Sequence, residues 1–296
     1  MKINRPTRYD SDDDTPRRST RRRKIILWSV IGILALTVGG YVAWTHRSPV
    51  SAVPIFQGVR YECIRLLPTP AGNGLAHIVE IDLKAPGIEL YVSPMETEAL
   101  IKGWQFTTVW PWRAASTQNL AVVVNGATFG DDDGFLPWPG DLARSSETVV
   151  SRGQVSHVDP NSYLMWFDRD LTPHIETTKP PSPDALAKAY WGMAGQEVVL
   201  YNGIVGTHGD IVDARTMIAC NPATKTLWLA VFENASYQLA ASTLADRGAT
   251  QGTMLDGGTS STMTLGAGVQ NVRRGTLLNG YRPVATVFGI RAKPLD

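Results

Sequence analysis

The stretch from Thr253 to Leu265 combines a lone carboxylate with a glycine-rich turn and a run of hydroxyl groups. An apolar pair ends at Asp256, two glycines follow, and residues 259–262 are all Thr or Ser. Glycines let the backbone come close to a ligand, and N–H groups and hydroxyls around such a turn can bind an anion. An acid beside an anion-binding turn suits cleavage of a phosphorylated or glycosidic substrate. A glycine-rich hairpin with aspartate as a turn residue is the alternative.

Three further polar motifs lie at the ends of predicted strands. Asn125 and Gly126 follow a buried-type apolar run, Arg215 and Thr216 precede a predicted strand, and Arg282 begins the last one. Arginine can hold a phosphate through two parallel donors, and asparagine can hydrogen-bond a sugar hydroxyl or N-acetyl group. We therefore expect these motifs and Asp256 to converge on one pocket. An arginine in a surface ion pair and an ordinary Asn-Gly turn are the alternatives.

Glycoside hydrolysis uses two carboxyl groups, one as an acid and one as a base or nucleophile. Asp256 is the first candidate because it stands at a strand exit. Glu233 and Asp141 are the candidates for the second role. Nearby tryptophans could stack on sugar faces or pack in the core; they are Trp104, Trp110, Trp112 and Trp138.

The sequence predicts neither a metal site nor a cofactor. No CxxC or HxxxH pair occurs, which argues against zinc. The acidic run 131–133 lacks the spaced pattern of a calcium loop, so we interpret it as a solvated loop. Cys63 and Cys220 lie in strand-like runs; outside the cytoplasm they could form a disulfide, and two separate buried thiols are the alternative.

Charge is distributed unevenly along the 296 residues. Residues 1–24 contain nine Lys/Arg and four Asp, a net charge of +5, so the remainder of this +1 chain has −4. A basic tail on a mildly acidic body argues against a nucleic-acid-binding protein, while the tail suits an anionic lipid surface.

Residues 25–44 form an uncharged, mostly apolar run of twenty residues. A helix of this length spans roughly 30 Å, enough for a bilayer. Nine cationic residues precede the run and only Arg47 follows closely, which predicts a cytoplasmic N-terminus. We expect a single-pass inner-membrane signal-anchor over 25–45 with a periplasmic catalytic domain. A cleaved signal peptide is the alternative.

Alternation of apolar and polar residues predicts many strands and few helices. Helical spacing occurs over 237–247 and 183–190, and no GxGxxG or P-loop sequence is present. We predict an α+β domain over 59–296, with a large mixed or antiparallel sheet and a few packed helices. It follows a disordered tail (1–24), the membrane anchor (25–45) and an extended linker (46–58).

The order of these motifs resembles the phosphodiester glycosidase family. The family includes the lysosomal uncovering enzyme, N-acetylglucosamine-1-phosphodiester α-N-acetylglucosaminidase, and bacterial exopolysaccharide-associated proteins. The resemblance covers roughly residues 60–292. It rests on NGxxF at 125–129, Arg-Thr at 215–216, LDGGxSSTM at 255–263 and Arg-Pro at 282–283.

Transferred position by position, the resemblance implies that the catalytic residues are Asp256, Glu233 and Asn125. It implies that the substrate-binding residues are Arg215, Thr216, Gly126, Gly257, Gly258, Thr259, Ser260, Ser261 and Arg282. The chain departs from the family pattern at three positions. Ala127 and Thr259 replace glycines, which narrows the loops, and Glu233 with Asn234 stands where Asp-Gly is frequent.

The resemblance implies hydrolysis of the glycosidic C–O bond of a sugar-1-phosphodiester, of the N-acetylglucosamine-1-phosphodiester type. We expect the substrate to be an envelope glycan or glycolipid. One alternative is a non-catalytic glycan-binding or scaffold protein of exopolysaccharide assembly. Another is a phosphodiesterase that cleaves the P–O bond.

Overall fold

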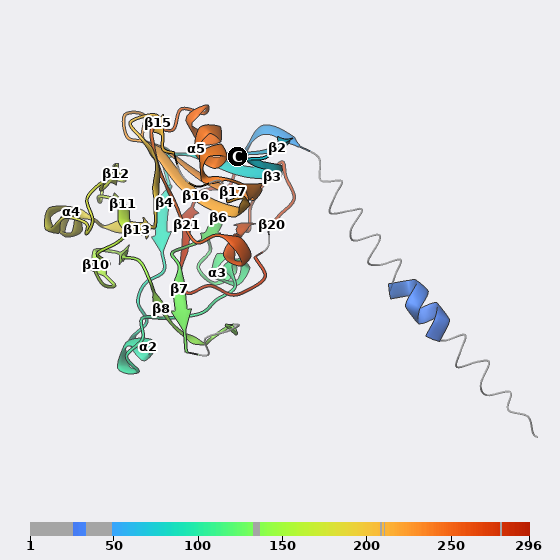
Figure 1. Ribbon diagram of the computed structural model, residues 1–296, viewed down its shortest axis with the longest axis horizontal. Coiled ribbons are helices and arrows are strands. Elements are labelled where there is room, and N and C mark those ends of the chain that lie inside the picture. Colours follow the sequence, from blue (N-terminus) through green and yellow to red (C-terminus); the bar gives the residue numbers. More distant parts are fainter. Residues whose placement is uncertain (1–25, 34–48, 133–136, 208, 210, 279) are drawn as a thin grey trace, which may run out of the picture. The chain divides into compact units, whose positions relative to one another are not determined.

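The computed structural model describes residues 26–33, 49–132, 137–207, 209, 211–278 and 280–296 (Figure 1). The chain divides into two units, Met1–Ser48 and Pro49–Asp296. In the first unit, residues 26–33 form a helix. No helix within the described ranges is long and apolar enough to cross a membrane. Most of the predicted tail and anchor lies outside the described residues.

The largest sheet of the second unit has eight strands, and every neighbouring pair in it is antiparallel. Its strands, in spatial order, are β1 (Val50–Phe56), β2 (Val59–Thr69), β3 (Gly72–Asp82), β17 (Thr226–Ala235), β16 (Asp213–Asn221), β18 (Gln251–Met254), β14 (Val198–Tyr201) and β15 (Ile204–Val205).

Both faces of this sheet are covered. On β17, Leu227, Leu229 and Val231 belong to the main hydrophobic core, whereas the alternate residues Trp228 and Phe232 pack in a second core. A continuous apolar strand is typical of a sheet buried on both sides. The helix α5 (Tyr237–Ala245) covers the second face and contacts β14 to β17, and it lies against β16 and β17 in Figure 1.

Three smaller sheets complete the architecture. One contains β10 (Gln154–Val155), β9 (Val149–Ser151), β13 (Trp191–Gly195), β11 (Tyr163–Phe167) and β12 (Pro173–Ile175). The next contains β20 (Gly275–Leu278), β19 (Met263–Leu265), β6 (Val122–Asn125), β21 (Val287–Arg291) and β4 (Glu89–Val92). The last contains β5 (Phe106–Thr107), β8 (Leu142–Ser145) and β7 (Phe129–Asp131).

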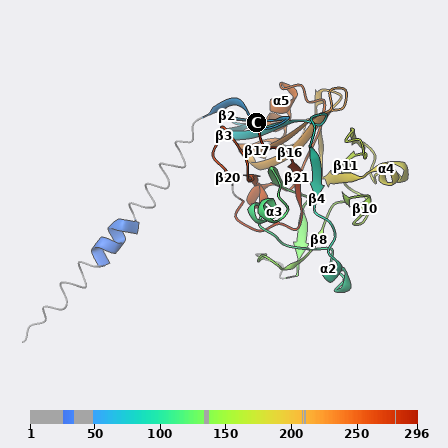
Figure 2. The same ribbon diagram turned by 180° about the vertical axis from the view of Figure 1, so that it is seen from behind.

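The helices in the described part of the second unit are short. They are α2 (Thr97–Ile101), α3 (Pro111–Thr117), α4 (Pro183–Lys188), α5 and the 3₁₀ turn η1 (Gly258–Ser260). The α5 helix begins after Ser236, whose hydroxyl accepts from the Leu239 amide at 3.1 Å. The α3 helix has Pro111 at its first position, where a missing N–H costs no hydrogen bond. Figures 1 and 2 show α5 and α2 at opposite ends of this unit.

The fold is mostly β, with several antiparallel sheets and few helices. This confirms the prediction of a large antiparallel sheet with packed helices, but the β content is higher than an α+β class implies. Val50–Phe56, which we predicted to be part of a linker, form β1 instead and pair with β2. The segment is a strand and not a linker because it pairs with β2 and so adds a strand at the edge of the large sheet.

Cys63 and Cys220 do not bond to each other. They lie on β2 and β16, and both β3 and β17 separate these strands. Three inter-strand steps amount to about 14 Å, which is beyond the reach of a disulfide. The alternative of two separate buried thiols therefore holds, and burial raises the pKa of Cys220 to about 12.

Core burial in the large sheet predicts a sharp contrast between two leucines. Leu229 is fully buried on β17, whereas Leu67 on β2 is 80% exposed. We expect Leu229→Ala to lower the free energy of unfolding by about 2–5 kcal/mol, and Leu67→Ala to change it by less than about 0.5 kcal/mol. Urea unfolding measures both. Equal effects would contradict the assignment of β17 to the core.

Candidate active site

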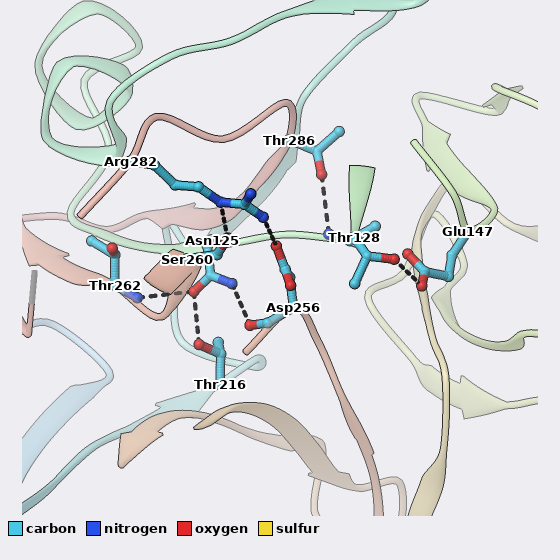
Figure 3. A network of polar contacts seen from close by, with 10 residues as sticks. Asn125, Thr128, Glu147, Thr216, Asp256, Ser260, Thr262, Arg282 and Thr286 are labelled. Carbon is cyan, nitrogen blue, oxygen red and sulfur yellow. Dashed lines mark hydrogen bonds and ion pairs between the residues drawn. The ribbon is translucent and has the colours of Figure 1, made fainter. Parts of the chain in front are cut away.

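Asn125, at the end of β6, is fully buried and joins three chain segments. Its Oδ1 accepts from Thr216 Oγ1 at 2.7 Å and from the Thr262 amide at 3.0 Å. Its Nδ2 donates to the carbonyl oxygen of Asp256 at 2.7 Å (Figure 3). The carboxamide therefore holds the end of β6, the start of β16 and the turn after β18 in one place.

Asp256 presents its carboxylate to Arg282. The Arg282 Nη2 lies 3.3 Å from Asp256 Oδ2, and its Nε donates to Ser260 Oγ at 2.9 Å. The guanidinium also lies over the ring of Phe129 at 4.7 Å. Burial raises the pKa of the Asp256 carboxyl, while the Ser260 hydroxyl and the positive charge of Arg282 oppose that shift.

The loop after Asn125 packs tightly against Thr286. The Gly126 amide donates to the Thr286 carbonyl at 2.8 Å, and the Ala127 amide donates to Thr286 Oγ1 at 3.1 Å. A Cβ at Gly126 would lie 2.3 Å from Thr286 Oγ1, so only glycine fits there. The Gly126 carbonyl in turn accepts from the Asp256 amide at 3.0 Å, which fixes the backbone of the acid.

A second carboxyl group, Glu147, lies at the same site. It follows β8, is buried, and accepts a hydrogen bond from the hydroxyl of Thr128. Burial raises the pKa of Glu147, the Thr128 hydrogen bond opposes the shift, and the negative charge of Asp256 raises it further. Figure 3 shows Asp256 between Arg282 on one side and Thr128 and Glu147 on the other. The buried Glu147 and the half-buried Asp256, in unequal surroundings, form the candidate acid–base pair.

The sequence matches the family model of the phosphodiester glycosidases over residues 118–291. That span includes Asn125, Glu147, Arg215, Asp256 and Arg282. The chain belongs to the phosphodiester glycosidase family.

Solved structures share the fold at low sequence identity. The catalytic domain of zebrafish N-acetylglucosamine-1-phosphodiester α-N-acetylglucosaminidase, described as auto-inhibited by its pro-peptide, is 14% identical with a TM-score of 0.58. The match covers 83% of this chain and 86% of that one. A hypothetical protein from Synechocystis has a TM-score of 0.53 at 13% identity. That match covers 82% of this chain and 64% of the Synechocystis chain.

A putative exported protein from Burkholderia pseudomallei K96243 also has a TM-score of 0.53, at 12% identity, with 74% of each chain covered. No curated protein matches the sequence. At these identities the structural likenesses establish the fold of this family member, and its chemistry has to be argued from its own residues.

The sequence suggested that the N–H groups of the hydroxyl-rich turn could bind an anion, but in the structure several of them donate to other atoms of the protein. The amides of Ser260 and Ser261 donate to Gly257 and Gly258 carbonyls at 3.1 Å, and the Thr262 amide donates to Asn125. These three N–H groups are therefore used inside the protein. Gly258 has φ +56°, a left-handed conformation that favours glycine. Thr259 is exposed, and its carbonyl accepts from the Tyr281 amide.

Arg215 lies beside the turn with most of its guanidinium engaged by the protein. Its Nε and Nη2 donate to the carbonyls of Ala235 and Ile211 at 3.2 and 2.7 Å, and it lies 4.4 Å over the Tyr237 ring. A Cβ at Gly257 would be 3.3 Å from Arg215 Nη1, so this nitrogen borders the Asp256 turn. Arg215 and Arg282 thus flank the same turn.

The two sequence-based candidates for the second carboxyl lie elsewhere. Glu233, on β17, accepts from the Leu75 amide of β3 at 2.9 Å, where the pairing of the two strands is irregular. Asp141 accepts from the Trp138 amide within its own loop. Among the residues that the structure describes, no hydrogen bond or ion pair joins either one to Asp256. Glu147 was not identified as a candidate from the sequence, because it stands in a strand-like run of hydroxyl and apolar residues. A single acidic residue in that run is the only sequence feature that could have pointed to it.

No group of three or more His, Cys, Asp or Glu side chains in the described part of the chain is arranged to hold a metal ion.

The raised pKa of Glu147 predicts how stability depends on pH. Between its ordinary value of about 4.5 and the raised value, the folded state keeps a proton that the unfolded state has lost. The free energy of unfolding should therefore fall as pH rises through this window. We expect Glu147→Gln to make that decline shallower, as measured by urea unfolding at several pH values.

Glu98→Gln, at an exposed position on α2, is the matched control and should leave the pH profile unchanged. A Glu147→Gln profile that parallels the wild type would show that Glu147 keeps an ordinary pKa in the folded protein.

Proposed function

We propose that this protein hydrolyses the glycosidic C–O bond of a sugar-1-phosphodiester, of the N-acetylglucosamine-1-phosphodiester type. The sugar is released and a phosphomonoester remains. The observation that most supports this is the pair of neighbouring carboxyls, the half-buried Asp256 and the buried Glu147, of which only Asp256 forms an ion pair with an arginine among the described residues. A glycosidase requires two carboxyls with different proton affinities.

In this proposal Glu147 is the general acid. Burial favours its protonated form, and the Thr128 hydroxyl fixes its orientation. When the C–O bond breaks, both electrons stay with the bridging oxygen, and the departing phosphate would gain a second negative charge. A proton from Glu147 neutralises that charge as it develops.

Asp256 acts at the anomeric carbon. Arg282 favours its ionised form, so it can attack the carbon directly or take a proton from the attacking water. Asn125 holds the Asp256 backbone and is buried, so we assign it a positioning role instead of direct contact with the substrate. Arg282 and Nη1 of Arg215, which border the same turn, are the groups we assign to the phosphate.

Variants of the two carboxyls should fail in different ways. We expect Asp256→Asn to lower kcat by at least about 10²–10⁴ with KM little changed, because acid–base assistance alone has that magnitude. Glu147→Gln should also lose kcat, but a nitrophenyl phosphodiester should partly restore it, since a more acidic leaving group requires less protonation. The same substrate should not restore Asp256→Asn.

Glu233→Gln and Asp141→Asn test the rival assignments, and Glu98→Gln is the neutral control. All three should keep wild-type kcat. If Glu233→Gln lost activity while Glu147→Gln kept it, the acid role would move to Glu233.

If the wild type bound glycans but turned over no phosphodiester, the protein would be a glycan-binding or scaffold protein. Hydrolysis in ¹⁸O water should label the sugar; label in the phosphate would mean P–O cleavage.

We also propose that residues 25–45 anchor the chain in the inner membrane, with the catalytic domain in the periplasm. The support is the excess of Lys/Arg before the apolar run. In that compartment the substrate would be a glycan or glycolipid of the envelope.

Reporter fusions after Asp296 test this topology. We expect alkaline phosphatase, which requires the periplasm, to be active, and β-galactosidase, which requires the cytoplasm, to be inactive. The reverse pattern would place the domain in the cytoplasm.

A further inference from the structure

We propose that a cavity next to the candidate active site binds additional sugar residues of the substrate, so that the natural substrate is an extended glycan. We name it the α3 cavity. It has a volume of about 520 Å³, and its lining includes Tyr91, Glu96, Thr107, Arg113, Gln118 and Ala285. The inference deepens the proposed function and rests on it for the link between sugar binding and catalysis.

Two chain segments connect this cavity to the active site. The segment that begins at Arg282 pairs with Val109 through Val284, lines the cavity at Ala285 and then holds the active-site loop through Thr286. In the small sheet, β8 lies between β5, which contributes Thr107 to the cavity, and β7, which continues from the Asn125 loop. Adjacent strands are about 4.8 Å apart, so the two sites are near neighbours.

The lining offers a carboxylate, which can accept hydrogen bonds from sugar hydroxyls, and guanidinium and amide groups, which can donate hydrogen bonds to them. Glu96 is fixed by Thr107: its Oε1 accepts from the Thr107 amide at 3.1 Å and from the hydroxyl at 2.9 Å, and Oε2 lies 2.8 Å from that hydroxyl. A carboxylate has about four acceptor positions, so Oε2 keeps capacity for a ligand. Arg113 and Gln118 are exposed on and just after α3 and supply donors.

Two exposed tryptophans adjoin the lining. Trp112 and Trp138 are 51% and 71% exposed, and they are the chain neighbours of the lining residues Arg113 and Pro139. Neither ring is part of the cavity lining itself, and we assign both to the rim of the sugar site. The C–H face of a pyranose covers such a ring while its hydroxyls reach polar groups.

The charge of the cavity favours a neutral sugar over a phosphate. Glu96 and Arg113 are the charged side chains in its described lining, and they balance each other. A phosphate site would need an excess of cations. The two arginines that border the Asp256 turn, Arg282 and Arg215, provide cations for a phosphate at the neighbouring site.

Ligand-observed saturation-transfer NMR on the full chain in detergent tests the inference directly. The probes are neutral tetrasaccharides of glucose and of N-acetylglucosamine, without phosphate. We expect at least one to bind, and we expect Arg113→Ala and Trp138→Ala each to weaken it about tenfold. Arg60→Ala on β2 and Tyr201→Ala on β14, exposed residues outside the cavity lining, are the matched controls and should bind as the wild type does. Asp256→Asn should also bind normally.

Kinetics then separate this inference from the proposed function. On a phosphodiester whose sugar is extended by a tetrasaccharide, Arg113→Ala and Trp138→Ala should raise KM about tenfold without changing kcat. On UDP-N-acetylglucosamine neither variant should differ from wild type. Turnover without tetrasaccharide binding, or binding that Arg113→Ala and Trp138→Ala leave intact, would overturn the inference. Binding that these variants weaken, without any turnover, would refute the proposed function and leave the sugar site standing.

Discussion

The site depends on one buried carboxamide. Asn125 connects β6, in the sheet that ends with β4, to Thr216 of the large sheet and to the turn that holds Asp256. Its Oδ1 accepts two hydrogen bonds, its Nδ2 donates one, and the side chain is fully buried. Each of those bonds would cost about 1–3 kcal/mol if its partner were left buried and unpaired. The position of the Asp256 backbone therefore depends on how the two sheets pack together, and not only on the conformation of its own turn.

Two acids buried near each other destabilise a fold unless their charge is compensated. Here the compensation is unequal: Arg282 and Ser260 support Asp256, whereas Glu147 has a neutral hydroxyl from Thr128. Burial raises the pKa of both carboxyls, and a positive charge opposes that shift only at Asp256. Such unequal surroundings are what the proposed division into an acid and a base or nucleophile requires.

The same strands that position these acids also shape the surface around them. The small sheet of β5, β8 and β7 links the active-site loop, Glu147 and the α3 cavity. An adjacent polar cavity with exposed tryptophans gives a physical reason for an extended glycan as substrate, since a small diester would leave that surface unused.

The sequence by itself determined the local elements and most of the polar residues of the site. Alternation of apolar and polar residues predicted a sheet of many strands, and helical spacing over 237–247 predicted α5, because these signals lie within a few neighbouring residues. The convergence of Asn125, Asp256 and Arg282 followed from motif order. Only the tertiary structure shows that Glu147 lies beside Asp256. Strand pairing directs Glu233 to the β3 backbone, and the crossover from β8 to β9 buries Glu147 beside Asp256. Such contacts join positions separated by 91 to 131 residues, as in the bonds of Asn125 to Thr216 and Asp256, and no local pattern encodes them.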